Sequence, residues 1–238
     1  MNLILFERAE IDRPLRREDS RARHILDVLR RAPGESFDVG LIDGPRGKAE
    51  VVSLDEHALT LRFTWHDSVP TPERITLIVG LPRPQTARDI LRDASTLGVA
   101  AMHFVRTDRG EPGYAQSTLW SSGEWARHVR AGLEQAFATN LPAVTHGRTL
   151  AETIAALPAH GTRLALDNYE SPEPLSQCRI LYDDVFLAIG AERGWSAAER
   201  ELLRAGGFRF VHLGSRVLRT ETACVAALTL VRAKLALT

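Results

Sequence analysis

The sequence contains few cysteines, very few lysines and no excess of charge of either sign. Cys178 and Cys224 are the only cysteines among its 238 residues, and they form no CxxC pair. Sparse cysteine is typical of a reducing compartment, so we expect an intracellular protein without a disulfide framework. The 30 basic and 30 acidic side chains cancel. A neutral chain does not bind nucleic acid through an overall positive charge, although the composition does not exclude a local basic patch.

The sequence also has no long hydrophobic run. Five of its first six residues are apolar, but charged residues follow at once. This stretch is too short for the apolar region of a secretory signal and far too short for a transmembrane helix. We therefore expect neither export nor a membrane span, and a cytoplasmic location.

Several common catalytic motifs are missing. No GxSxG marks a nucleophile elbow, and no GxGxxG follows a strand, which argues against a Rossmann dinucleotide site. The eight histidines lie in no HExxH motif, so we expect no metal site. The run from Gly44 to Ala49 resembles a phosphate loop only faintly, since Ile42 stands where that loop needs glycine. We interpret this run as a hairpin turn.

The basic residues are nearly all arginine, because only Lys48 and Lys234 are lysines. Between Arg8 and Arg31 there are eight arginines and five acidic residues, so this stretch carries a net charge of +3. Arginine binds phosphate with two parallel hydrogen bonds, which makes the stretch a candidate RNA contact. A general preference for arginine over lysine would produce the same composition. The candidate contacts are Arg16, Arg17, Arg21, Arg23 and Arg30.

The first 65 residues show a pattern of short strands with one helical interruption. Ile25, Val28 and Leu29 would share one face of a helix over residues 20–29. Apolar residues alternate with polar ones in the strand candidates, which predicts a small antiparallel sheet or barrel. The expected strands cover residues 2–6, 37–43, 48–55 and 58–65.

The pattern changes after residues 66–74, which contain two prolines and few apolar residues. Beyond this boundary apolar strands alternate with amphipathic helices, which predicts an α/β domain with a mostly parallel sheet. We therefore expect two domains, residues 1–70 and 71–238. The expected strands are 75–81, 99–105, 163–167, 185–190 and 208–213. The expected helices are 86–97, with Ala87, Ile90, Leu91, Ala94 and Leu97 on one face, 121–138, which Ser121 or Ser122 can cap, 149–157, one that starts at a capping box of Ser196 and Glu199, and 220–237, capped by Thr220.

Two loops near the C-terminus are unusually rich in glycine and polar residues. In the first, residues 187–196, Gly190 and Gly194 follow a buried strand and would let the backbone approach a ligand. An ordinary strand-to-helix loop would explain it equally well. The second, residues 213–223, places two arginines, a glutamate and two threonines before the last helix. That density of polar groups at a helix N-terminus favours a binding site.

The second loop, LGSRVLRTETA, resembles the C-terminal signature of the small-subunit rRNA uracil-N3 methyltransferases, a family of the SPOUT class that uses S-adenosylmethionine (SAM). The resemblance extends over essentially the whole chain. HILDVLRRAPGESFDV resembles part of the family's N-terminal RNA-binding PUA-like barrel, and ILRDASTLGV resembles the first helix of its catalytic domain. Glu134-Gln135 with Leu141-Pro142 resembles the family's E-Q…P segment, and IGAERGWS stands in the place of its IGPEGG-type loop.

The resemblance implies a PUA-like β-barrel followed by a trefoil-knotted α/β methyltransferase domain, with the chain between Gly190 and Leu218 in the knot. It also implies a homodimer whose active sites lie near the partner subunit. The expected substrate is a uridine of 16S rRNA in the small ribosomal subunit. The implied SAM contacts are Leu166, Ile189, Gly190, Glu192, Leu213, Gly214, Leu218, Arg219 and Thr220.

Methyl transfer to uracil N3 requires loss of the N3 proton. A nearby cation would favour the resulting imide anion, and Arg219 is the candidate for it. Glu221 would orient Arg219 or bond across the dimer. Alternatively, Arg219 and Glu221 form only a structural ion pair.

The chain departs from the family pattern at four positions. Ala191 and Arg193 stand where the family usually has proline and glycine, while Thr86 and Ala138 stand where it has basic residues. These differences leave two alternatives open. One is a SAM-dependent SPOUT methyltransferase with another RNA substrate, and the other is a catalytically silent RNA-binding or ribosome-assembly protein.

Overall fold

The computed structural model describes residues 3–237, which divide into two compact units. The chain passes from the first unit to the second between Thr71 and Pro72. The segment Leu133–Leu141 belongs to the first unit, which the sequence pattern did not indicate. The second unit consists of Pro72–Gly132 and the chain from Pro142 onward.

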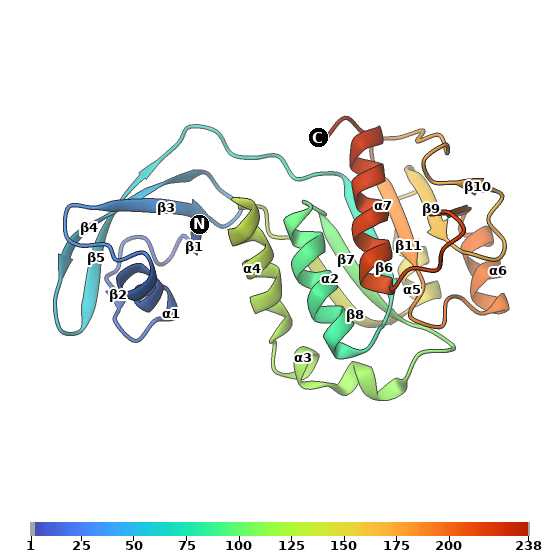
Figure 1. The fold of residues 1–238 in the computed structure, drawn as a ribbon, viewed down its shortest axis with the longest axis horizontal. Helices are drawn as coiled ribbons and strands as arrows, with labels where there is room; N and C mark the ends of the chain where they lie inside the picture. Colours follow the sequence, from blue (N-terminus) through green and yellow to red (C-terminus); the bar gives the residue numbers. More distant parts are fainter. Residues whose placement is uncertain (1–2, 238) are drawn as a thin grey trace. The chain divides into compact units, whose positions relative to one another are not determined.

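The first unit is built on a five-stranded sheet (Figure 1). Its strands are antiparallel except for β1 and β3, which pair in parallel. A register shift between Val51 and Ser53 marks a β-bulge, which bends and twists a sheet. Asn2, the first residue of the expected strand 2–6, lies outside the described residues. In spatial order the strands are β1 (Ile4–Phe6), β3 (Ser36–Leu41), β4 (Arg46–Leu54), β5 (Ala58–Trp65) and β2 (Leu15–Arg16).

The expected helix over residues 20–29 is present in altered form. An α-turn, α1 (Ser20–Arg23), continues as a π-helix, η1 (His24–Val28). Ala22 and Ile25 are buried in the core of the unit. The wider π-turn changes the angular spacing of side chains, and Val28 is 65% exposed. The prediction that Val28 shares one helical face with Ile25 is therefore wrong.

The second unit contains a seven-stranded sheet in which every pairing is parallel. The sequence pattern predicted a mostly parallel sheet here. The edge strands β8 and β10 were not predicted, because neither has a buried apolar run. In spatial order the strands are β10 (Glu173–Pro174), β12 (Arg209–His212), β9 (Thr162–Leu166), β11 (Val185–Ile189), β6 (Ile75–Gly80), β7 (Ala101–Arg106) and β8 (Ala143–Thr149).

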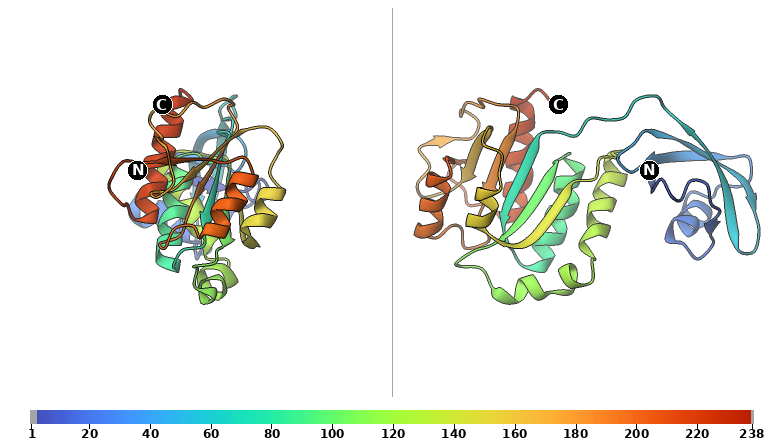
Figure 2. Two further views of the ribbon diagram at one scale, coloured as in Figure 1. Left: turned by 90° about the vertical axis from the view of Figure 1, so that its right-hand side faces the viewer. Right: turned by 180° about the vertical axis from the view of Figure 1, so that it is seen from behind.

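Helices cover both faces of this sheet. Figures 1 and 2 show α2 and α7 on one face and α5 and α6 on the other. The helical elements are α2 (Pro84–Thr96), the 3-10 helix η2 (Pro112–Gln116), α3 (Thr118–Ser121), α4 (Trp125–Ala136), α5 (Leu150–Ala155), α6 (Ala197–Ala205) and α7 (Thr220–Lys234).

The predicted helix caps are confirmed at one helix and wrong at two others. Ser196 and Glu199 form the expected capping box of α6. By contrast, Ser121 ends the short α3 and α4 begins only at Trp125, so the predicted serine cap of one long helix is wrong. Thr220 is the first helical residue of α7 rather than its cap. In the described part of the chain, no helix is long and apolar enough to cross a membrane.

The strand order determines where a ligand can bind. From β6 the chain moves outward through β7 and β8, then crosses to β9 on the other side of β11. A crevice opens at the carboxyl ends of parallel strands where the strand order reverses in this way. Here the order reverses between β6 and β11, so the crevice lies at the carboxyl ends of these two strands, beside those of β9 and β12.

Candidate functional site

A cavity of about 720 Å³ lies at this position in the second unit. Pockets for ligands of cofactor size occupy about 300–1,000 Å³. The cavity brings together both polar loops identified in the sequence and the start of α2. The predicted cofactor contacts that line it are Leu166, Ile189, Gly190, Glu192, Leu213, Leu218, Arg219 and Thr220, together with the predicted catalytic Glu221. Gly214 follows Leu213 in the adjoining loop but is not among the residues that line the cavity.

The loop after β11 is packed tightly against itself. A Cβ atom on Gly190 would lie 2.9 Å from the Cα of Gly194, and Gly194 has a φ of +63° that favours glycine. The Gly194 N–H donates to the Ala191 carbonyl at 2.8 Å. Trp195 is fully buried, and its Nε1–H donates to the Leu166 carbonyl at 3.2 Å. This tryptophan therefore joins the ends of β9 and β11 beneath the cavity.

Glu192 holds the start of α2 beside the cavity. Its Oε1 accepts the backbone N–H of Arg83 at 3.0 Å and the Arg83 Nε–H at 3.3 Å. Arg109 donates to the Arg193 carbonyl at 3.1 Å, which anchors the same loop from another side. Thr86, one of the departures from the family pattern, is buried and lines the cavity. The loop after β11 is thus held by two arginines from elsewhere in the unit.

The first turn of α7 leaves backbone N–H groups without helical partners. Arg219 occupies the N-cap position and supplies no side-chain cap. Such free N–H groups and the helix dipole favour a negatively charged ligand group. Arg219 itself is exposed, and among the described residues its side chain makes no hydrogen bond or ion pair with Glu221. The structural ion pair considered above is therefore not formed within this chain.

Neither cysteine is a candidate nucleophile. Cys224 lies one turn beyond Glu221 in α7 and is buried. Burial, with a smaller contribution from Glu221, raises the pKa of the Cys224 thiol well above its ordinary value. Burial also raises the pKa of the Cys178 thiol. Both side chains stay protonated and unreactive near neutral pH.

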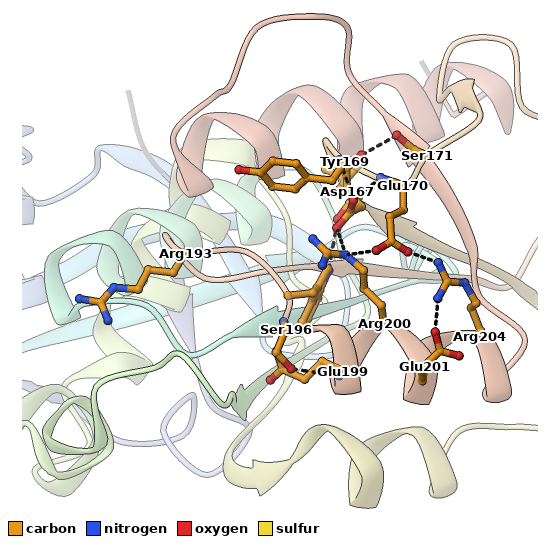
Figure 3. A network of polar contacts seen from close by, with 12 residues as sticks. Asp167, Tyr169, Glu170, Ser171, Arg193, Ser196, Glu199, Arg200, Glu201 and Arg204 are labelled. Carbon is orange, nitrogen blue, oxygen red and sulfur yellow. Dashed lines mark hydrogen bonds and ion pairs between the residues drawn. The ribbon is translucent and has the colours of Figure 1, made fainter.

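Sequence reasoning missed the loop after β9. Asp167, Asn168 and Tyr169 line the cavity directly after Leu166. Figure 3 shows that Asp167 and Glu170 contact arginines of α6. A polar run directly after a buried strand could have marked this loop as part of a site. Nothing in the sequence, however, indicates that Asp167 contacts Arg200.

The candidate RNA contacts in the first unit divide into two groups. Arg21 donates to both carboxylate oxygens of Glu10, at 2.9 and 2.7 Å, and to both of Asp19, at 3.1 and 2.8 Å. Its guanidinium also lies 4.9 Å from the centre of the Phe6 ring. The remaining Nη1–H of Arg21 donates to the Leu5 carbonyl at 3.2 Å, so all five N–H donors are used within the unit. Arg21 therefore has a structural role, and we do not retain it as an RNA contact. The exposed members of the set are Arg16, Arg17, Arg23 and Arg30.

Comparison with known proteins shows the family. A family model described as an RNA methyltransferase domain matches residues 69–232. The chain is 37% identical to Ribosomal RNA small subunit methyltransferase E of Treponema pallidum over 98% of this chain and 91% of that protein. It is 22% identical to Ribosomal RNA small subunit methyltransferase E 1 of Borreliella burgdorferi over 99% of both chains.

Solved structures show the same fold. The methyltransferase E of Neisseria gonorrhoeae, solved bound to S-adenosyl methionine, superimposes with a TM-score of 0.80 at 24% identity over 97% of both chains. A methyltransferase of Legionella pneumophila, solved with bound SAM, has a TM-score of 0.75 at 25% identity over 89% of this chain and 88% of that one. The expected fold class, a small β domain followed by a SPOUT-type α/β methyltransferase domain, is confirmed. The chain belongs to the ribosomal RNA small subunit methyltransferase E family.

Proposed function

We propose that this protein transfers the methyl group of SAM to N3 of a specific uridine in 16S rRNA. The observation that carries the proposal is the cavity itself, in which the LGSRVLRTETA segment meets the carboxyl ends of β9 and β11. The relatives named above are ribosomal RNA small subunit methyltransferases, and two similar structures were solved with SAM.

The cavity fits SAM in both size and chemistry. Leu166, Ile189 and Leu218 would offer apolar contacts to the adenosine, with Gly190 allowing close approach of the backbone. The free N–H groups at the start of α7 would receive a carboxylate. When bound, SAM supplies an electrophilic methyl group on its sulfonium.

The protein's own contribution is to align the uracil, exclude water and stabilise charge. Arg219 is exposed at the cavity and has no partner among residues 3–237, so its guanidinium is free to contact the uracil. Loss of the N3 proton leaves negative charge on the imide, which this cation would stabilise. Glu221, at the same helix start, would orient Arg219 or bond across a dimer.

The remaining expectations belong to the same proposal. The first domain, residues 1–70, would bind RNA as a PUA-like barrel through Arg16, Arg17, Arg23 and Arg30, and residues 71–238 would form the methyltransferase domain. The chain would form the trefoil knot between Gly190 and Leu218 and assemble as a homodimer. A ribosomal RNA substrate would place the protein in the cytoplasm.

Two measurements on one preparation test the proposal. Titration calorimetry measures SAM binding, and transfer of labelled methyl groups to unmodified 30S subunits measures activity. Methylation at N3 blocks base pairing, so reverse transcription should stop at a single position. Binding without transfer would favour another RNA substrate, while no binding would favour the silent RNA-binding protein.

A further inference from the structure

Tyr169 is a large aromatic side chain that the fold presents to solvent at the edge of the cavity. Its side chain is 82% exposed, although the residue lies only three positions beyond the end of β9. It lines the cavity together with Leu166 and Asp167. An exposed aromatic ring on a free loop would be unremarkable, but this loop is held firmly from beneath.

Two buried residues hold the loop in place. Oδ1 of Asp167 accepts the backbone N–H of Tyr169 at 2.8 Å and that of Glu170 at 2.7 Å. Oδ2 of the same carboxylate accepts Nε–H of Arg200, from α6, at 2.8 Å. Asp167 and Arg200 are both buried. The backbone that carries Tyr169 is therefore tied to a helix rather than left free.

Arg200 also supports the ring. Its guanidinium carbon lies 5.5 Å from the centre of the Tyr169 ring, within the range of a cation–π contact. Glu170 pairs with Arg200 at 3.7 Å and with Arg204 on the next turn of α6. Figure 3 shows this network with the tyrosine ring extending beyond it. The arrangement orients the ring and leaves most of its surface free.

We propose that Tyr169 is a stacking platform for a nucleobase of the RNA substrate, and that Asp167 and Arg200 are its positioning residues. This inference rests on the proposed function, because that function makes RNA the substrate. Bases of single-stranded RNA stack on aromatic side chains without regard to sequence, because every base has a π face. A base drawn out of its helix for reaction at N3 needs such a surface, because it loses its stacking partners.

The ring's exposure favours an RNA base over the adenine of SAM. The predicted SAM contacts Ile189 and Thr220 are buried, so the cofactor would lie at the strand ends. Tyr169, at 82% exposed, is far more accessible to a second ligand than either of these two residues. The adenine assignment is the competing outcome of the test.

The test compares Tyr169→Ala and Tyr169→Phe with the wild-type protein. Tyr182→Ala is the matched control, because Tyr182 is 54% exposed in the same unit and does not line the cavity. Stacking on an aromatic side chain predicts that Tyr169→Ala lowers kcat/KM for unmodified 30S subunits by between about 5-fold and about 150-fold. Tyr169→Phe and Tyr182→Ala should keep wild-type kcat/KM. The Kd for SAM should be unchanged in all three.

The positioning role has its own readout. Asp167→Asn retains an oxygen that can accept the Tyr169 and Glu170 N–H groups, whereas Asp167→Ala removes it. We expect Asp167→Asn to keep more of the wild-type kcat/KM than Asp167→Ala, with the loss appearing in KM for RNA. Equal loss in the two variants, or loss only in kcat, would overturn the positioning assignment.

Direct binding separates this inference from the proposed function. If the wild-type protein binds SAM but methylates no uridine of the 30S subunit, the proposed function fails. Stacking is then measured by fluorescence anisotropy with a labelled single-stranded oligouridine. Weaker binding by Tyr169→Ala than by Tyr182→Ala supports the platform. Equal binding by both overturns it, and so does a raised Kd for SAM in Tyr169→Ala.

Discussion

Arg219 is the single residue on which the proposed chemistry depends most. It is exposed, lines the cavity and has no partner among the described residues, so its removal should leave the fold intact. Loss of a group that stabilises developing negative charge costs about 10²–10³ in turnover. We expect Arg219→Ala to lose methyl transfer to that extent with an unchanged melting temperature. Arg216→Ala, which removes another exposed arginine of the cavity, is the control. Full activity of Arg219→Ala would remove Arg219 from the mechanism.

A substitution at Gly190 changes the shape of the cavity without changing its charge. A methyl group there would meet Gly194 at 2.9 Å, so the loop that carries Glu192 must shift. Overpacking of this kind costs about 1–3 kcal/mol, so we expect the Kd for SAM to rise on the order of tenfold in Gly190→Ala. Gly113→Ala is the matched control, because no neighbouring atom of the described residues lies within 4 Å of its added Cβ. Calorimetry should give the wild-type Kd for that variant.

At the scale of elements, the contact between α6 and the loop after β9 is a buried ion pair. The side chains of Arg200 and Asp167 are 9% and 3% exposed. Removing one partner leaves the other charge buried, which costs about 3–5 kcal/mol. We expect Arg200→Met to lower the free energy of unfolding of the second unit by that amount. Arg204→Met, one turn along α6 at a more exposed pair, should cost about 1 kcal/mol or less. Chemical denaturation compares the two.

In the first unit, Arg21 ties α1 to the loop that contains Glu10. Its hydrogen bonds lower the pKa of both Glu10 and Asp19. A carboxylate whose pKa is lower in the folded state contributes stability above its unfolded pKa, near 4, and loses it as pH falls through the folded value. We therefore expect the unit's melting temperature to fall on acidification below about pH 4. Arg21→Met should melt lower at pH 7 and show a weaker acid dependence. An unchanged pH profile in Arg21→Met would contradict this assignment.

At the scale of the whole molecule, the neutral net charge means that RNA affinity must come from local arginines. Each phosphate contact that is lost should reduce the slope of log Kd against log salt by about one. We expect the combined variant Arg16→Gln, Arg17→Gln, Arg23→Gln and Arg30→Gln to show a shallower slope in 30S binding. Arg62→Gln is the control, since Arg62 is an exposed arginine paired with Glu50. An unchanged slope would remove these residues from the RNA interface.

Much of this organisation follows from local pattern. Periodicity predicted both the strand β11, from its apolar run, and the helix α2, from the spacing of its apolar residues. The structure confirms both elements, and the residues that carry the α2 pattern are buried: Ala87, Ile90, Leu91 and Ala94. The capping box at Ser196 predicted the start of α6. Such features depend on residues within one or two helical turns, so they can be read along the chain. The LGSRVLRTETA segment likewise indicates the family from sequence alone.

Other features depend on which distant segments meet. Strand order alone brings Leu166, Ile189 and Leu213 to one cavity, although more than forty positions separate the first from the last. The sequence predicted Arg21 as a phosphate contact, but in the folded chain its guanidinium is bound by Glu10 and Asp19. The orientation of Tyr169 depends on Arg200, a residue of α6 whose guanidinium lies against the Tyr169 ring. The sequence by itself determined the elements and the residue types at the site, because these depend on local periodicity. Only the tertiary structure decided which charges are already paired and which remain for a ligand, because that depends on partners contributed by other elements.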